Sequence, residues 1–286
     1  MTNPNAGRET KGLQNAEAAV VEDFGREWIQ FDQSTLSDAE RQEIFEGYFA
    51  VFPWNELPPN AVGFDAGCGT GRWAVLVAPR VGRLHCVDPS NAIDVARRNL
   101  LPFTNCEFHQ ATVNEMPFAD GSMDFGYSLG VLHHVPDTQA GIEACVQKLK
   151  PGAPLLLYLY YALDNQPVWY RTLWKASDFL RRRIAGLPFR QKYWISQVLA
   201  ASVYYPLART ARVLARIGLS VHSFPLSAYR DLSFYAMRTD ALDRFGTKLE
   251  KRFSRPQIQE MMEAAGLQDV RFSDRLPFWC AVGKRR

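Results

Sequence analysis

The sequence predicts an α/β protein built on an open seven-stranded sheet, with five parallel strands, a C-terminal hairpin and a helical cap. Short apolar runs alternate with amphipathic stretches between residues 61 and 161, which is typical of parallel strands joined by helices. A glycine-rich stretch, "GFDAGCGTGR", lies where the first strand meets its helix. Two short apolar runs close enough to pair as a hairpin end the chain.

The composition indicates a globular protein. Of the 286 residues 47% are hydrophobic, enough for one large domain with a cap. The polar start of the chain has no apolar signal core, and the longest apolar run, Pro154 to Leu163, is about half a membrane span. Five cysteines without a CxxC pair or metal-ligand spacing favour reduced thiols, a cytoplasmic location and no metal site.

The N-terminal region divides into two parts. Residues 1–15 are polar, and we expect them to be disordered. Residues 16–60 carry apolar residues at helical spacing in "AVVEDFGREWIQFDQ" and "SDAERQEIFEGYFAVF", which predicts two helices. Ser37 and Glu40 have the spacing of a capping box that opens the second helix, and "PWNELPPN" ends the pattern.

The sheet is predicted from the alternation that follows. Helices are expected over 71–81, over 91–100 with Ser90 as the N-cap, and over 138–150. The five parallel strands are expected over 61–67, 83–89, 105–110, 123–130 and 153–161.

The alternation stops for about ninety residues after Tyr161 and resumes at Ser254, where "SRPQ" is a second capping-box pattern. That helix is expected to end at Gly266, and the hairpin strands follow over 268–274 and 277–284. Residues 61–161 and 254–286 therefore form the predicted core. Residues 162–253 form a predicted cap of short helices, rich in aromatic and basic residues and interrupted by prolines.

The glycine loop predicts a ligand site. Gly67, Gly69 and Gly71 follow Asp65 at the carboxyl end of the first strand, where ligands of open parallel sheets bind. A nicotinamide-dinucleotide fingerprint, G-x-G-x-x-G, would need glycine where this chain has Arg72. The G-K-[ST] ending of a phosphate-binding P-loop is absent from the sequence as well.

Two further elements suggest a nucleoside. Asp88 ends the second strand, where its carboxylate can accept hydrogen bonds from two ribose hydroxyls. In "HQATVNEMPF", a polar residue before "MPF" can accept from the exocyclic amine of adenine while a main-chain N–H meets a ring nitrogen. Each of these positions also has a structural alternative to ligand binding. Asp65 could cap the following helix, Asp88 could be a turn residue, and Thr112 could be an ordinary surface hydroxyl.

Five motifs together resemble one family. "FDAGCGTGR", "CVDPS", "MPFADGSMDF", "SLGVLHHVPD" and "LKPGAPLLLY" are similar to class I S-adenosylmethionine-dependent methyltransferases, in the branch of quinone and small-molecule methylases. The resemblance covers residues 61–161 and 254–284 and implies a Rossmann-like seven-stranded methyltransferase sheet. It also implies S-adenosyl-L-methionine as cofactor and S-adenosyl-L-homocysteine as product. The long segment before the last helix departs from the family pattern.

The resemblance also implies roles for matching residues. Asp65 orients the methionine amino group through the loop, and the three glycines lie against the amino acid and ribose. Asp88 holds the ribose diol, and Pro89 flanks the adenine. Thr112, in place of a common aspartate, and Val113 lie at the adenine edge, while Ser128 to Gly130 form the wall beneath the sulfonium. The implied cofactor-binding residues are Asp65, Gly67, Gly69, Gly71, Asp88, Pro89, Thr112, Val113, Ser128 and Leu129.

The implied reaction is methyl transfer to the oxygen or nitrogen of a small molecule by in-line displacement. Alignment and exclusion of water are the main requirements, so no fixed catalytic triad is expected. Tyr160 and Tyr161, where the fifth strand reaches the cleft, are the first candidates for positioning the acceptor, and His134 is the second. The segment 229–253 lacks helical periodicity and either lines the acceptor pocket or forms a salt-bridged turn.

Charge is concentrated in the predicted cap. Residues 165–218 contain ten Lys or Arg and one acid, Asp178, for a net charge of +9. This charge favours an acidic or phosphorylated small acceptor steered by the cap. Alternatives are a solvated face, an oligomer contact, or docking on a membrane surface that would suit a lipid or quinone acceptor. A non-catalytic S-adenosylmethionine-binding protein is a further alternative, and no nucleic-acid partner is expected because no recognisable module is present.

Overall fold

The computed structural model describes residues 15–33 and 35–286. The prediction that residues 1–15 are disordered falls on residues outside these ranges, with the exception of Asn15. The side chain of Asn15 donates hydrogen bonds to Oδ1 of Asn114 at 2.9 Å and to the carbonyl of Asp137 at 2.7 Å.

The core is a seven-stranded sheet with the strand order β3-β2-β1-β4-β5-β7-β6. Five neighbouring strands are parallel, and β7 pairs antiparallel with both β5 and β6. The predicted sheet and hairpin are thereby confirmed. The strands are β1 (Val62–Ala66), β2 (Arg83–Val87), β3 (Cys106–His109), β4 (Phe125–Leu129), β5 (Pro154–Tyr158), β6 (Leu267–Phe272) and β7 (Cys280–Arg285).

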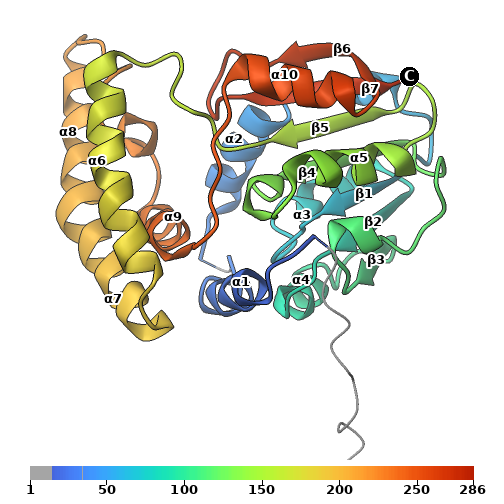
Figure 1. Cartoon of the computed structure of the whole chain (residues 1–286), viewed down its shortest axis with the longest axis horizontal. Coiled ribbons are helices and arrows are strands. Elements are labelled where there is room, and N and C mark those ends of the chain that lie inside the picture. Colours follow the sequence, from blue (N-terminus) through green and yellow to red (C-terminus); the bar gives the residue numbers. More distant parts are fainter. Residues whose placement is uncertain (1–14, 34) are drawn as a thin grey trace, which may run out of the picture.

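Helices cover both faces of the sheet (Figure 1). One face packs on α2 (Asp38–Tyr48), α3 (Ala74–Val77) and α4 (Ala92–Asn99), and the other on α5 (Thr138–Lys148) and α10 (Arg255–Ala264). Strands β2, β5 and β7 contribute side chains to both apolar layers because successive side chains point to opposite faces. The sheet is therefore the middle of three layers.

The predicted helix starts differ in accuracy. Ser254 and Gln257 form the complete capping box at α10. Ser37 accepts from the Glu40 N–H at 3.2 Å, but the Glu40 carboxylate accepts from the main chain of Ser233 instead of closing the box. The Ser90 prediction is wrong by one residue, because α4 has Asn91 as its N-cap.

The remaining N-terminal helix, α1 (Ala18–Gln30), crosses the carboxyl edge of the sheet. Trp28 lies over the glycine loop, since a β-carbon placed on Gly69 would be 3.4 Å from its indole nitrogen. The helix expected over 71–81 is shorter than predicted, with α3 followed by a 3₁₀ turn over Ala78–Arg80.

The segment between β5 and α10 is a helical layer beside the sheet, with its own apolar cluster. In Figure 1, α6, α7 and α8 lie on the side away from the sheet, and α9 lies between them and the core. A π-helical turn, Ala200–Tyr204, joins α7 to α8. These helices are α6 (Val168–Ala185), α7 (Phe189–Leu199), α8 (Tyr205–Arg216) and α9 (Phe234–Gly246).

The lack of helical periodicity in residues 229–253 gave no indication of α9, which occupies 13 residues of this segment. Its buried positions include Met237, Thr239 and Leu242, which spread around the helix instead of forming one stripe. A helix covered on more than one side does not show the amphipathic period of a surface helix.

Core packing predicts a contrast between two leucines. Leu156 on β5 is fully buried, whereas Leu101 is 77% exposed. We expect Leu156→Ala to lower the free energy of unfolding by about 2–5 kcal/mol through lost burial and a residual cavity. Leu101→Ala is the matched control and should change it by less than about 0.5 kcal/mol. Urea denaturation measures both, and equal effects would contradict the assigned core.

Candidate functional site

A cavity of about 730 Å³ lies where the carboxyl ends of the strands, α1 and the helical cap meet. Its wall on the sheet side includes the glycine loop and the ends of β2, β4 and β5. Its wall on the cap side includes α9 and the segments around residues 226–232 and 252. The cavity therefore joins the glycine loop to cap segments that lie more than a hundred residues further along the sequence.

The glycine loop requires its glycines. Gly67 and Gly69 have φ angles of +82° and +52°, in the region that side chains disfavour. A β-carbon on Gly67 would also lie 2.3 Å from Val131. Gly67 donates its N–H to the carbonyl of Val87 at 2.8 Å, which ties the loop to β2. The main chain is thus exposed to the cavity at a point where no side chain could fit.

Asp88 holds the loop from the neighbouring strand. Its Oδ2 accepts from the Gly69 N–H at 3.0 Å, and its Oδ1 accepts from the N–H of Ser90 at 2.9 Å and from the hydroxyl of Ser90 at 2.6 Å. Burial raises the pKa of Asp88, while these hydrogen bonds lower it. The carboxylate lines the cavity, and its Oδ2 retains one acceptor site for a hydroxyl donor, because each oxygen can accept two hydrogen bonds and Oδ1 already accepts two.

The predicted adenine edge lies on the same wall. Thr112 and Val113 line the cavity, and the Thr112 hydroxyl donates to Glu115 at 2.9 Å. With its hydrogen committed to Glu115, the oxygen of Thr112 is left as an acceptor, which suits an exocyclic amine. These residues, the exposed loop main chain and Asp88 fit the amine, amino-acid and ribose groups of S-adenosylmethionine.

Three of the predicted cofactor-binding residues are not part of the cavity wall. Ser128 donates to the Ala66 carbonyl at 2.8 Å, and Gly71 packs on Leu100 and Ala96. Asp65 is buried behind the loop, and burial raises its pKa to about 8 against the lowering effect of the neighbouring Tyr127 hydroxyl. Their positions suit a role in supporting the loop. The predicted residues that line the cavity are Gly67, Gly69, Asp88, Pro89, Thr112, Val113 and Leu129.

The three predicted acceptor-positioning residues, His134, Tyr160 and Tyr161, all line the cavity. His134 follows β4, and its ring packs 4.9 Å from the ring of Phe24. Tyr160 stacks on His133 with ring centroids 3.8 Å apart, and its hydroxyl donates to Asp243 of α9. The sheet edge and the cap therefore meet directly at these residues.

Sequence reasoning did not single out the charged residues of α9 and its neighbours. Asp240, Asp243 and Arg244 from α9 line the cavity, as do Arg72 and Arg252. Burial raises the pKa of Asp240 and of Asp243 to about 6 in each case. The density of Asp, Arg and Tyr in residues 229–253 was the available signal, and these residues line the cavity from within a helix.

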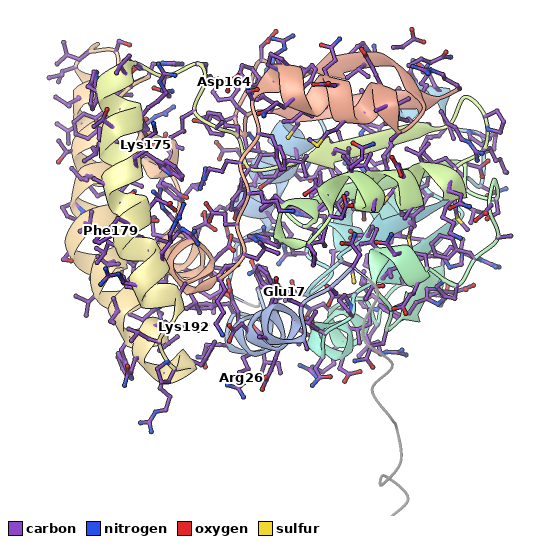
Figure 2. All side chains as sticks on the ribbon, viewed as in Figure 1. Glu17, Arg26, Asp164, Lys175, Phe179 and Lys192 are labelled. Atoms are coloured by element: carbon purple, nitrogen blue, oxygen red, sulfur yellow. The ribbon has the colours of Figure 1, made fainter. Side chains whose placement is uncertain are left out.

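The basic residues of the cap, which were expected to face the acceptor, do not line the cavity. All ten Lys and Arg of residues 165–218 are described, and none lines the cavity. Arg181 and Arg182 share Asp178, and Lys192 bonds Asp23 on α1 at 2.6 Å. Figure 2 shows Lys192 on the side of the cap that approaches α1. These cations build or coat the cap instead of facing the bound molecule.

A sheet of this order, with a glycine loop at its carboxyl edge and an acid after the second strand, is typical of α/β proteins that bind a nucleoside cofactor at this edge. Residues 64–157 match the family described as "Methyltransferase domain". Residues 64–157 are accordingly a class I S-adenosylmethionine-dependent methyltransferase domain, which confirms the family and the cofactor predicted from the motifs.

Several known proteins are similar to this chain. "Demethylmenaquinone methyltransferase" of Desulfitobacterium hafniense is 27% identical over 58% of this chain and 68% of its own length. "Probable tRNA methyltransferase 9B" of Homo sapiens is 30% identical over 47% of this chain, which spans only 32% of that relative. A solved SAM-dependent methyltransferase from Aquifex aeolicus shares the fold, with a TM-score of 0.50, 14% identity, and 91% and 96% of the two chains covered.

No helix in residues 15–33 and 35–286 combines the length and the hydropathy needed to cross a bilayer.

The assigned cofactor end predicts the effect of removing one carboxylate. Asp88→Ala should weaken S-adenosylhomocysteine binding by about 1–3 kcal/mol, because charge-assisted hydrogen bonds to the ribose and the loop are lost. Isothermal titration measures the change. Asp94→Ala on the exposed side of α4 is the control, and its affinity should stay unchanged. An unaltered affinity in Asp88→Ala would contradict the ribose assignment.

Proposed function

We propose that the protein transfers the methyl group of S-adenosylmethionine to a small-molecule acceptor held between the sheet edge and the cap. The single observation that supports this proposal is the shared cavity. Gly67, Gly69 and Asp88 lie on the sheet side, Asp243 of α9 lies on the cap side, and Tyr160 lies where the two sides meet. A donor on the first wall and an acceptor on the second would be enclosed together.

This arrangement suits the chemistry. In-line displacement needs the nucleophile, methyl carbon and sulfur in one line, and it needs water kept away. The cap supplies aromatic rings: Tyr229 lines the cavity, and the buried ring of Tyr204 packs against it with ring centroids 5.4 Å apart. Aromatic faces also stabilise positive charge that is spread over the reacting centre. The proposed roles of His134, Tyr160 and Tyr161 are to orient the acceptor.

Enclosure favours a small acceptor over a polynucleotide. Relatives from three mammals carry the name of a tRNA methyltransferase, and each of them matches less than half of this chain. The cap here extends from Ala162 to Arg252 and covers the cavity that a nucleic acid would have to enter. A cytoplasmic location and the division into a core and an inserted cap remain predictions from the sequence.

The test is a methyl-transfer assay with fractionated small-molecule extracts and a labelled methyl donor. We expect S-adenosylhomocysteine together with label on a small molecule that mass spectrometry can identify, and lower turnover with Asp88→Ala when the methyl donor is limiting. Asp94→Ala should retain full activity. Cofactor binding without product in any fraction would indicate a non-catalytic binding protein, and label in the RNA fraction would indicate a nucleic-acid acceptor.

A second candidate is an acceptor presented by a membrane. Of the sixteen large apolar residues that are exposed in the described chain, twelve lie within residues 168–219. Trp169, Phe179 and Trp194 are among them, each more than half exposed. Exposed cations such as Lys175 and Arg183 share the same helices. An apolar and basic face of this kind is complementary to an anionic bilayer.

This candidate predicts binding to lipid vesicles. The protein should co-sediment with vesicles rich in phosphatidylglycerol, less with pure phosphatidylcholine, and less at high salt. Phe179→Ser combined with Trp194→Ser should reduce the bound fraction several-fold, while Ile29→Ser, exposed outside the cap, should not. Equal binding by both variants, or a dimer that forms through this face in solution, would contradict a membrane surface.

A further inference from the structure

Two hydrogen-bond acceptors face each other without a donor at the cap end of the cavity. Nε2 of His134 lies 4.0 Å from Oδ1 of Asp243. Both atoms are buried, and within the part of the chain that the structure describes neither has a hydrogen-bond partner. Both residues line the cavity. Because buried polar atoms are almost always paired, the missing donor is expected from a bound molecule.

The tautomer of His134 is fixed by its other nitrogen. Nδ1 lies 2.6 Å from the main-chain carbonyl of Leu249, and a carbonyl can only accept, so Nδ1 carries the hydrogen. Burial lowers the pKa of His134 to about 4, which keeps the ring neutral at physiological pH. Nε2 therefore presents a lone pair.

Asp243 is fixed in a similar way. Its Oδ2 accepts from the hydroxyl of Tyr160, whose ring is held against His133. Only Oδ1 remains for a ligand. Burial raises the pKa of Asp243 to about 6, so the carboxylate is still ionised at pH 7.5. The site thus offers one neutral and one anionic acceptor, both immobile.

We propose that this pair binds the amino group of the methyl acceptor, which is a primary amine. The inference rests on the methyl-transfer function proposed above and specifies the class of acceptor. A nitrogen placed about 2.9 Å from each atom spans the 4.0 Å gap, so that one amino group can donate to both.

Other head groups fit less well. A hydroxyl has one hydrogen and leaves one of the two acceptors unpaired, and a carboxylate or phosphate supplies no donor and is repelled by Asp243. The neighbouring Arg252 is already paired with Glu250 at 2.8 Å and lies over the ring of Tyr160, 5.1 Å from its centroid. An anionic acceptor, expected from the charge of the cap, is therefore not favoured at this position.

The geometry leads to a balanced transfer. The acceptor enters as an ammonium ion. Two of its N–H groups donate hydrogen bonds to Asp243 and His134, and its third proton leaves to solvent. The freed nitrogen lone pair, directed away from both residues, forms a bond to the methyl carbon. The carbon–sulfur bond breaks, and its electron pair remains on sulfur. Positive charge moves from sulfur to a nitrogen that lies beside the Asp243 carboxylate, which stabilises it.

Binding tests this inference without turnover. Three probes share one aromatic ring and differ in head group: 2-phenylethylamine, 2-phenylethanol and 3-phenylpropionate. With the protein saturated with S-adenosylhomocysteine, isothermal titration at pH 7.5 should show the amine binding about tenfold or more tightly than the other two, since only it pairs both acceptors with a charge-assisted bond. Equal affinities, or a preference for the carboxylate, would overturn the proposal.

Asp243→Asn is the sharpest variant because it preserves shape and can still accept from Tyr160. The amide of the introduced asparagine can donate a hydrogen bond to Nε2 of His134, so that this acceptor no longer needs a donor from a ligand. The advantage of the amine should then disappear, while S-adenosylhomocysteine affinity stays as in the wild type. His134→Gln is a second variant with the same expected loss, and Asp274→Asn, exposed on the surface, is the control. An undiminished preference for the amine in both site variants would overturn the assignment.

The turnover assay separates this inference from the proposed function. A methylated nitrogen in the product supports the inference, and a methylated oxygen or sulfur overturns it while leaving the methyltransferase intact. Preferential amine binding without any S-adenosylhomocysteine formation supports the amine site and counts against catalysis.

Discussion

The hydrogen bonds of the Asp88 carboxylate to the main chain of the glycine loop are the constraint on which the site depends. Gly69 has a left-handed main-chain conformation, and its N–H donates to Asp88 from the neighbouring strand. The parallel pairing of β1 with β2 brings the two segments to the same edge of the sheet. One carboxylate thereby shapes the loop and lies on the wall of the cavity that the loop helps to form.

The cap is joined to this edge by polar contacts and main-chain pairing. Lys192 connects α7 to α1 through Asp23, and Tyr160 connects the end of β5 to α9 through Asp243. The chain that returns from the cap to α10 pairs with the sheet edge, where the Phe253 N–H donates to the carbonyl of Tyr160 at 2.9 Å. Because the same strand end carries Tyr160 and receives the returning chain, a displacement of α9 would also alter the cavity wall.

The sequence was sufficient for the core because its elements are local. Alternating apolar runs, the Ser254 capping box and the glycine loop each act within about ten residues, and the structure has the predicted strands and hairpin. Asp240 and Asp243 could not be assigned in this way. Asp243 gains its significance from Tyr160 and His134, and Asp240 from Arg72, which only the folded chain brings near. The helix α9 lacks an amphipathic stripe because it is covered on more than one side.

The distribution of charge also shows why net charge was a poor guide to the acceptor. The basic residues of the cap either pair with acids, as Arg181 does with Asp178, or remain on the outer helices. A cation in solvent is screened within about 10 Å at ordinary ionic strength, whereas a buried carboxylate acts through a medium of low polarity. The groups that dominate the electrostatics of the proposed acceptor site are therefore those that are close to it and shielded from water. Asp243, with a buried oxygen that has no partner among the described residues, bears more directly on the choice of acceptor than the exposed arginines of the outer helices, and Arg72, Arg244 and Arg252 share the cavity wall with it.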